Sequence, residues 1–174
     1  MPRGRKPTVV DTNVAIIANH RDGGSYSCAS SCAKELMRLR ETGLLLLDSH
    51  GLILSEYKDY LNYKGQPGAG DAFFRWFFNN RGRKDLCREV TINGITAPWR
   101  LFREFPADEN LKDFDRSDQK FVATARAEDV HAVIVQASDH KWLRWNPHLE
   151  KHGVIVRFLC REEMAETAER KEAR

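Results

Sequence analysis

Two aspartates directly follow apolar segments that are typical of buried strands. Asp11 follows the β-branched run at 8–10, and Asp139 comes shortly after the apolar run at 132–135. The carboxyl ends of parallel strands meet at one edge of a sheet, and ligands bind outside that edge. Both carboxylates are therefore candidates for binding or catalysis. The alternative at both positions is a structural one, in which the side chain caps the following helix.

Glu56 and Asp118 lie on helical faces that are otherwise apolar. The residues at i−4, i−3 and i+4 from Glu56 are leucine, isoleucine and tyrosine, and those at i+3 and i+4 from Asp118 are phenylalanine and valine. Such neighbours share one face of a helix, where an uncompensated carboxylate is costly. Asp115, three residues before Asp118, can point the same way. The alternatives are a cap for Asp115, a favourable helix dipole for Asp118, and an arginine partner or a rim position for Glu56.

Divalent cations would compensate such a group of carboxylates. Carboxylates held close together repel one another, and each resists ionisation. Carboxylate and water oxygens are the ligands that Mg²⁺ and Mn²⁺ prefer. These ions can activate a water molecule and stabilise the leaving oxygen in phosphodiester cleavage. If the four acids converge, they therefore predict a metal-dependent phosphodiesterase centre.

The segments around these acids predict an α/β protein. Short apolar strands are expected at 8–11, 44–47, 132–135 and 154–158, with a further one at 90–92. Helices are expected at 13–20, 27–42, 52–63, 71–78, 117–127, 140–145 and 162–174. Strands that alternate with helices favour a central parallel sheet, here of about four to five strands, sandwiched by helices.

The chain of 174 residues fits a single domain. We expect a flexible basic arm at 1–7, one domain at 8–160 and a charged C-terminal helix at 161–174. Within the domain, the interval 64–114 is long and contains an aromatic cluster at 73–78. We expect that cluster to pack on the core or on a partner rather than to stack on bases.

The net charge of +3 is unevenly distributed. Seven basic and two acidic residues lie between Arg75 and Arg103, so the rest of the domain is acidic. An acidic body with basic flanks suits carboxylate-held metal ions beside a polyanionic substrate, although chance segregation is the simpler alternative. Arg81, Arg83 and Lys84 are the best candidates for contacts with an RNA backbone.

The order of four sequence motifs resembles that of the PIN-domain nucleases, whose small members include the VapC-type toxin ribonucleases. The motifs are VVDTNVAI, LILSEYKDYL, SDQKFVATARA and VQASDHKWL, and the resemblance spans residues 8–158. It implies a parallel sheet between helices. It also implies cleavage of RNA, or in some members of single-stranded or structured DNA, by a water that carboxylate-held Mg²⁺ or Mn²⁺ activates.

The resemblance also implies roles for individual residues. The residues carried over as catalytic metal ligands are Asp11, Glu56, Asp118 and Asp139. Asp115 is an additional metal-binding candidate, and Asn13 matches a polar residue that contacts substrate. The family often has Ser or Thr two residues before the last acid. That position is Ala137 here, so the adjacent Ser138 is the expected substitute.

Two other functions remain as alternatives. A catalytically inactive PIN-like module would bind RNA or protein and would not need a metal. A phosphatase of the haloacid dehalogenase type also begins with a strand and an aspartate, but its second aspartate is replaced here by Asn13. The expected partners are RNA, a second copy of the chain and, if the protein is a toxin, a neutralising antitoxin-like protein. Phage defence and RNA processing are equally open roles.

The remaining sequence features predict a cytoplasmic protein. No apolar run is long enough to cross a membrane, and the N-terminus lacks a secretory signal. The four cysteines, Cys28, Cys32, Cys87 and Cys160, are expected to be reduced core residues. No Cys/His pair completes a zinc set, and we expect none from His148 and His152.

Overall fold

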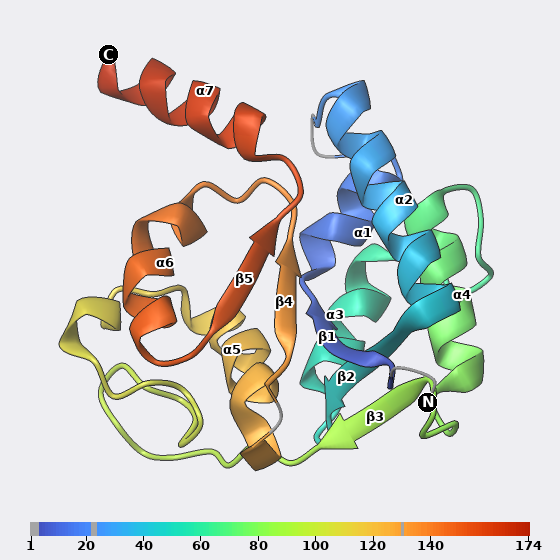
Figure 1. Ribbon diagram of the computed structural model, residues 1–174, viewed down its shortest axis with the longest axis horizontal. Helices are drawn as coiled ribbons and strands as arrows, with labels where there is room; N and C mark the ends of the chain where they lie inside the picture. Colours follow the sequence, from blue (N-terminus) through green and yellow to red (C-terminus); the bar gives the residue numbers. More distant parts are fainter. Residues whose placement is uncertain (1–3, 22–23, 130) are drawn as a thin grey trace.

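The computed structural model describes residues 4–21, 24–129 and 131–174, so Arg3 of the predicted arm and Asp22 and Gly23 of a predicted loop lie outside it. Five strands form one parallel sheet in the order β3-β2-β1-β4-β5 (Figure 1). The strands are β1 (Lys6–Val10), β2 (Gly43–Asp48), β3 (Cys87–Val90), β4 (Val133–Gln136) and β5 (Ile155–Phe158). The predicted α/β class and the parallel sheet are confirmed.

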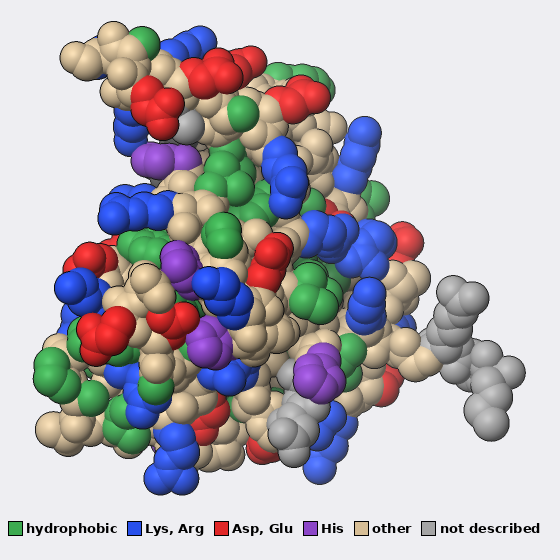
Figure 2. Space-filling model, turned by 60° about the vertical axis from the view of Figure 1, so that its left-hand side comes forward, with side chains coloured by type: hydrophobic (Ala, Val, Ile, Leu, Met, Phe, Trp, Pro, Cys, Tyr) green, Lys and Arg blue, Asp and Glu red, His purple; other side chains and the backbone are tan. Residues whose placement is uncertain are grey.

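Helices connect all five strands. The α-helices are α1 (Thr12–Ala18), α2 (Tyr26–Thr42), α3 (Leu52–Tyr60), α4 (Ala69–Asn80), α5 (Gln119–Arg126), α6 (Lys141–Lys151) and α7 (Arg161–Glu172). Three short 3₁₀ helices lie at Glu109–Leu111, Arg116–Asp118 and Ala127–Asp129. Acidic side chains gather on α7, the charged C-terminal helix, at the top of the surface in Figure 2.

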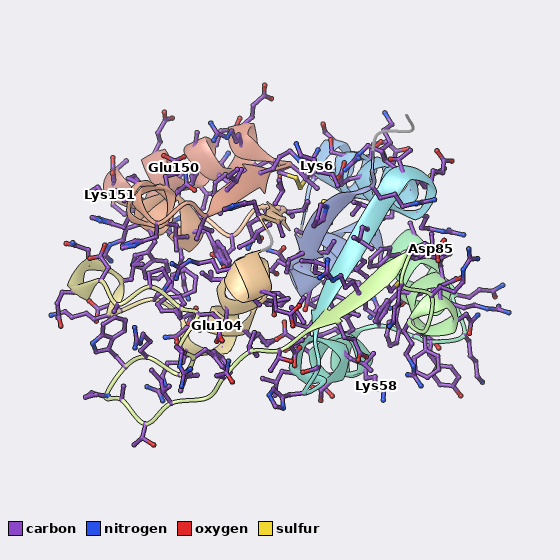
Figure 3. The ribbon with its side chains drawn as sticks, turned by 60° about the horizontal axis from the view of Figure 1, so that its bottom comes forward. Lys6, Lys58, Asp85, Glu104, Glu150 and Lys151 are labelled. Carbon is purple, nitrogen blue, oxygen red and sulfur yellow. A yellow bond between two sulfur atoms is a disulfide. The ribbon has the colours of Figure 1, made fainter. Side chains whose placement is uncertain are left out.

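Both faces of the sheet centre are covered. In β1 and β2, consecutive residues that point to opposite faces are buried, which requires helices on each side. The helix α2 contacts β2 on one face, and α5 packs across β1, β2 and β4 on the other (Figures 1 and 3). The carboxyl edge of the sheet is therefore held between two layers of helices.

The aromatic cluster of α4 is a core element, as predicted. Phe73, Phe74 and Phe77 are fully buried and surround the ring of Tyr57 from α3 in edge-on contacts. Edge-to-face geometry of this kind adds to the hydrophobic gain of burial. The cluster thus joins α4 to the helix that carries Glu56.

Several element boundaries differ from the predicted ones, among them the following three. The edge strand β3 lies at Cys87–Val90 rather than at 90–92, because its two middle residues, Arg88 and Glu89, are exposed and hide the apolar pattern. The helix α6 continues beyond 145 to Lys151 and contains Pro147. In the predicted arm, residues 6 and 7 belong to β1, and Arg5 donates a hydrogen bond to Gly43.

The cysteine prediction was wrong for two of the four residues. Cys28 in α2 and Cys160 before α7 form a disulfide across a sequence separation of 132 residues. Cys32 and Cys87 are unbonded and buried, as expected. The fold brings Cys28 and Cys160 together at the top of β5, a proximity that the sequence spacing did not reveal.

In the described part of the chain, no helix combines the length and apolar character that a membrane span requires.

Candidate active site

The four acids converge at the carboxyl edge of the sheet. Asp11, Glu56, Asp118 and Asp139 line one cavity of about 710 Å³. Its other lining residues are Thr12, Asn13, Ile16, Leu52, Ser55, Asp59, Tyr60, Leu101, Phe102, Arg116, Ser117 and Lys120. The four carboxylates come from four separate elements, so the tertiary fold assembles the cavity.

Asp11 lies between β1 and α1 and is only 6% exposed. One carboxylate oxygen accepts the backbone N–H of Asn13 at 2.9 Å, and the other accepts the side-chain amide of Gln136 at 3.1 Å. Asp11 is thus a helix cap, but each oxygen keeps a lone pair for a further ligand. Burial raises the pKa of Asp11 well above its ordinary value, and Asp118, Glu56 and Asp139 raise it further.

Glu56 is positioned by the way α3 begins. The chain turns at Gly51, where φ is +77°, a conformation that favours glycine. The buried carboxylate of Asp48 then accepts the first backbone N–H groups of α3, from Leu52 and Ile53, both at 2.9 Å. One turn into the helix, Tyr57 donates its hydroxyl to the carbonyl of Val10 at 2.5 Å. These contacts fix α3 against the end of β1.

The carboxylate of Glu56 has two partners within the cavity. Thr12 donates its hydroxyl to Oε1 at 2.6 Å, and Lys120 forms an ion pair with Oε2. The Lys120 side chain is 10% exposed and also donates to the carbonyl of Ser117. The predicted alternative of an arginine partner for Glu56 was wrong in residue type, because the ion pair forms with a lysine.

Asp118 ends a 3₁₀ turn immediately before α5 and makes no capping hydrogen bond. Its Oδ2 accepts the indole N–H of Trp142 at 3.2 Å. Burial raises the pKa of Asp118 to about 6, and the charges of Asp115 and Asp139 act in the same direction, against the Trp142 hydrogen bond. A proton therefore competes with any cation for this carboxylate near neutral pH.

Asp139 and Asp115 differ in their relation to the cavity. Asp139 lines it and accepts the backbone N–H of Lys141, the first residue of α6, at 3.0 Å, whereas the N-cap position of α6 is His140. Asp115 forms an ion pair with Lys141 at 3.2 Å and lines a neighbouring hollow instead. Asp115 is thus adjacent to the four acids and is not a wall of their cavity.

The two predicted polar contacts, Asn13 and Ser138, also differ in whether they line the cavity. Asn13 lines the cavity, and its side-chain oxygen accepts the backbone N–H of Ala137 at 3.4 Å. This bond ties α1 to the loop that carries Asp139. Ser138 is partly buried and is not among the residues that line the cavity. Its expected role as a substitute hydroxyl stays a prediction.

The three predicted RNA contacts lie elsewhere. Arg81, Arg83 and Lys84 precede β3, at the amino end of the strand, whereas the acids lie beyond carboxyl ends. In Figure 3, Asp85 marks the start of β3, the end of the strand that follows these three residues. Arg81 lies over the ring of Phe78, and Arg83 pairs with Asp85. Any contact that they make with RNA is outside the cavity.

Several cavity residues were not predicted. Lys120 and Arg116 supply positive charge, and Tyr60 and Phe102 supply aromatic surface. Lys120 is two residues from Asp118, a signal that was present in the sequence. Phe102 comes from the irregular segment before α5. The buried side chain of Gln119 holds this segment by hydrogen bonds to the backbone of Trp99 and Leu101. No local pattern marks that segment as part of a site.

Carboxylate oxygens are the ligand type that hard divalent cations prefer, but among the described residues no three of these carboxylates lie within 4.8 Å of one another. Carboxylate oxygens dominate the cavity, and burial together with mutual repulsion opposes ionisation of Asp11 and Asp118. A divalent cation would relieve this repulsion and replace the protons. No thiol or imidazole group lines the cavity, which disfavours a site built for a softer metal.

No protein-family model matches the sequence, and neither the curated proteins nor the solved structures contain a match. The likeness to PIN-domain nucleases stays a prediction, with which the parallel fold is compatible.

Proposed function

We propose that this protein is a metal-dependent endoribonuclease. Asp11, Glu56, Asp118 and Asp139 would hold Mg²⁺ or Mn²⁺, as the predicted motifs implied. The observation that carries the proposal is the convergence of these carboxylates from separate elements in one cavity, where burial raises the pKa of two of them. A purely structural role would not require four acids to share one hollow.

A bound divalent cation would offset the phosphate charge and make a water molecule more acidic. The contribution of the protein chain is to position the carboxylates. Asp11 is held on both oxygens by Asn13 and Gln136, so its orientation is fixed before substrate arrives. Fixed carboxylates need no reorganisation during the reaction, which is the main electrostatic advantage of such a site.

The remaining cavity walls suit a nucleic-acid strand. Arg116 and Lys120 can neutralise phosphate oxygens, and the exposed ring of Tyr60 offers a stacking surface for a base. Phe102 is a second aromatic residue that lines the same cavity. We propose RNA rather than DNA as the substrate because the motif resemblance favours it.

The decisive experiment compares wild type with Asp11→Asn on RNA and single-stranded DNA, with Mn²⁺, Mg²⁺ or a chelator. We expect metal-dependent cutting by wild type and loss of at least ~10³-fold of the rate in the variant. Asp113→Asn, which changes an exposed acid outside the cavity, is the matched control. Cutting by Asp11→Asn at the wild-type rate would refute the metal assignment.

A second candidate function, that of an inactive RNA- or protein-binding module, has one observation in its favour. Thr12 and Lys120 already satisfy both oxygens of Glu56 without a metal, as an inactive RNA- or protein-binding module would need. Calorimetric titration with Mn²⁺ separates the two functions. The nuclease binds the ion and loses affinity in Asp11→Asn, whereas the inactive module binds it equally weakly in both forms.

Homodimer formation, a neutralising protein partner and a cytoplasmic location stay predictions that accompany the nuclease proposal. Gel filtration of the purified protein tests the first of these directly.

A further inference from the structure

We propose that Cys28, Cys32, Cys160 and Glu163 form a Zn²⁺ site when the Cys28–Cys160 disulfide is reduced. The three sulfur atoms lie within 4.8 Å of one another, and all three cysteines are buried. The cluster is at the junction of α2 and α7, apart from the cavity of the four acids.

The fold supplies three thiols from two elements. Cys28 and Cys32 are four residues apart in α2, so their side chains share one face of that helix. Cys160 directly precedes α7 and comes from the other end of the chain. The N-terminal end of a helix favours a negative charge, so this position suits a thiolate.

Glu163 would provide the fourth donor after its side chain rotates, since its carboxylate oxygens are not within 4.8 Å of all three sulfurs. Its Oε1 is shielded from solvent and has no hydrogen-bond partner within the part of the chain that the structure describes. Glu163 lines the same hollow, of about 570 Å³, as Cys28 and Cys160. A buried carboxylate oxygen without a partner is costly, and a cation would satisfy it.

Three sulfurs and one carboxylate oxygen match the chemistry of zinc. Structural zinc sites are tetrahedral, take four protein ligands and are built largely from cysteine thiolates. The same donors disfavour Mg²⁺ and Mn²⁺, which prefer oxygen ligands. The guanidinium group of Arg161 lines the same hollow and can offset part of the negative charge of the loaded site.

Reduction and zinc loading are two separate steps. A small dithiol reductant transfers two electrons and two protons to the Cys28–Cys160 bond, which gives two thiols and leaves the reductant as its own disulfide. Zn²⁺ then replaces the protons of the three thiols, and Glu163 binds as the fourth ligand. Both the disulfide and the ion would join α2 to the start of α7.

The test uses the full chain, reduced with a phosphine and titrated with Co²⁺, whose thiolate charge-transfer absorption reports sulfur ligands alone. We expect this absorption in wild type, with Zn²⁺ displacing Co²⁺. Cys32→Ser, which keeps the disulfide pair, and Glu163→Gln should each weaken binding at least ~10-fold. Cys87→Ser, which changes the other unbonded buried cysteine, is the matched control and should bind as wild type does.

A second measurement does not depend on any variant folding. X-ray absorption of zinc-loaded wild type should count three sulfur neighbours and one oxygen. The proposal is overturned if reduced wild type shows no cobalt–thiolate absorption, if Cys32→Ser binds like Cys87→Ser, or if the zinc neighbours are only oxygen and nitrogen. The last result would place the ion among the four acids of the cavity.

Discussion

Lys120, at the start of α5, forms an ion pair with Glu56, in the middle of α3, on the wall of the acidic cavity. The pair joins two elements that flank the sheet edge and partly neutralises the carboxylates there. A metal ion that uses Glu56 must compete with the ammonium group of Lys120. In the proposed metal site, this ion pair would therefore lower the affinity for the metal.

Replacing Lys120 with methionine should tighten Mn²⁺ binding about tenfold, because the competing cation is removed. Titration calorimetry measures the change. Lys58→Met removes an exposed positive charge from α3 and serves as the control. Weaker Mn²⁺ binding in Lys120→Met would show that Lys120 organises the site rather than competing for it.

Without metal, the contribution of Asp118 to the stability of the protein should fall as the pH rises from 4 to 7. The pKa of Asp118 is about 6 in the fold, above the ordinary value of 3.8, so the folded state binds more protons in this range. The contribution of Asp118 to the free energy of unfolding is complete below its pKa in the unfolded chain and is lost as the pH rises through 6. Asp11 acts in the same direction.

Asp118→Asn should flatten this pH dependence, with a gain of about 1–2 kcal/mol at pH 7.5 in the absence of metal. Urea unfolding at pH 5 and pH 7.5, in chelator and in Mg²⁺, measures the effect. Saturating Mg²⁺ should reverse the order, so that wild type becomes the more stable protein. An unchanged slope in chelator would mean that Asp118 is not the titrating group.

Asp48→Ala should destabilise the protein by about 1–2 kcal/mol, because α3 loses the carboxylate that caps its first N–H groups. The same change should lower the proposed nuclease rate, since α3 carries Glu56. Denaturant unfolding and a cleavage assay give the two values. Asp85→Ala, which removes an exposed acid before β3, should leave both values near wild type.

Neutralising Arg81, Arg83 and Lys84 together should weaken binding of long RNA and reduce its salt dependence. A tetranucleotide should be cut at the wild-type rate, because these residues lie at the amino end of β3, a strand length from the acids. Filter binding at several salt concentrations checks the first part. An unchanged salt slope with long RNA would remove the three residues from the interface.

The parallel sheet and the convergence of the four acids could be predicted from the sequence alone. Three consecutive buried residues in β1 mark a strand covered on both faces, and Asp11 follows it directly. Glu56 and Asp118 were detectable because a carboxylate on an apolar helix face is unusual. These signals are local, so they can be read without knowing the fold.

The contacts across the fold were not predictable in the same way. The pairing of Lys120 with Glu56 depends on how α5 and α3 flank the sheet, and 64 residues separate the two. The basic residues before β3 were assigned to the substrate from charge alone, without knowledge of the strand's direction. The disulfide joins residues whose proximity follows only from the position of β5 beside β4.

The Cys28–Cys160 bond turns most of the chain into a covalent ring with two short tails. Glu56, Asp118 and Asp139 lie inside the ring, and Asp11 lies on the N-terminal tail. One protease cut in the irregular segment between β3 and α5 would open the ring without releasing a fragment. When the oxidised protein is pulled from its two ends, only the tails can lengthen, and the tail with Asp11 can leave the sheet while the ring stays closed.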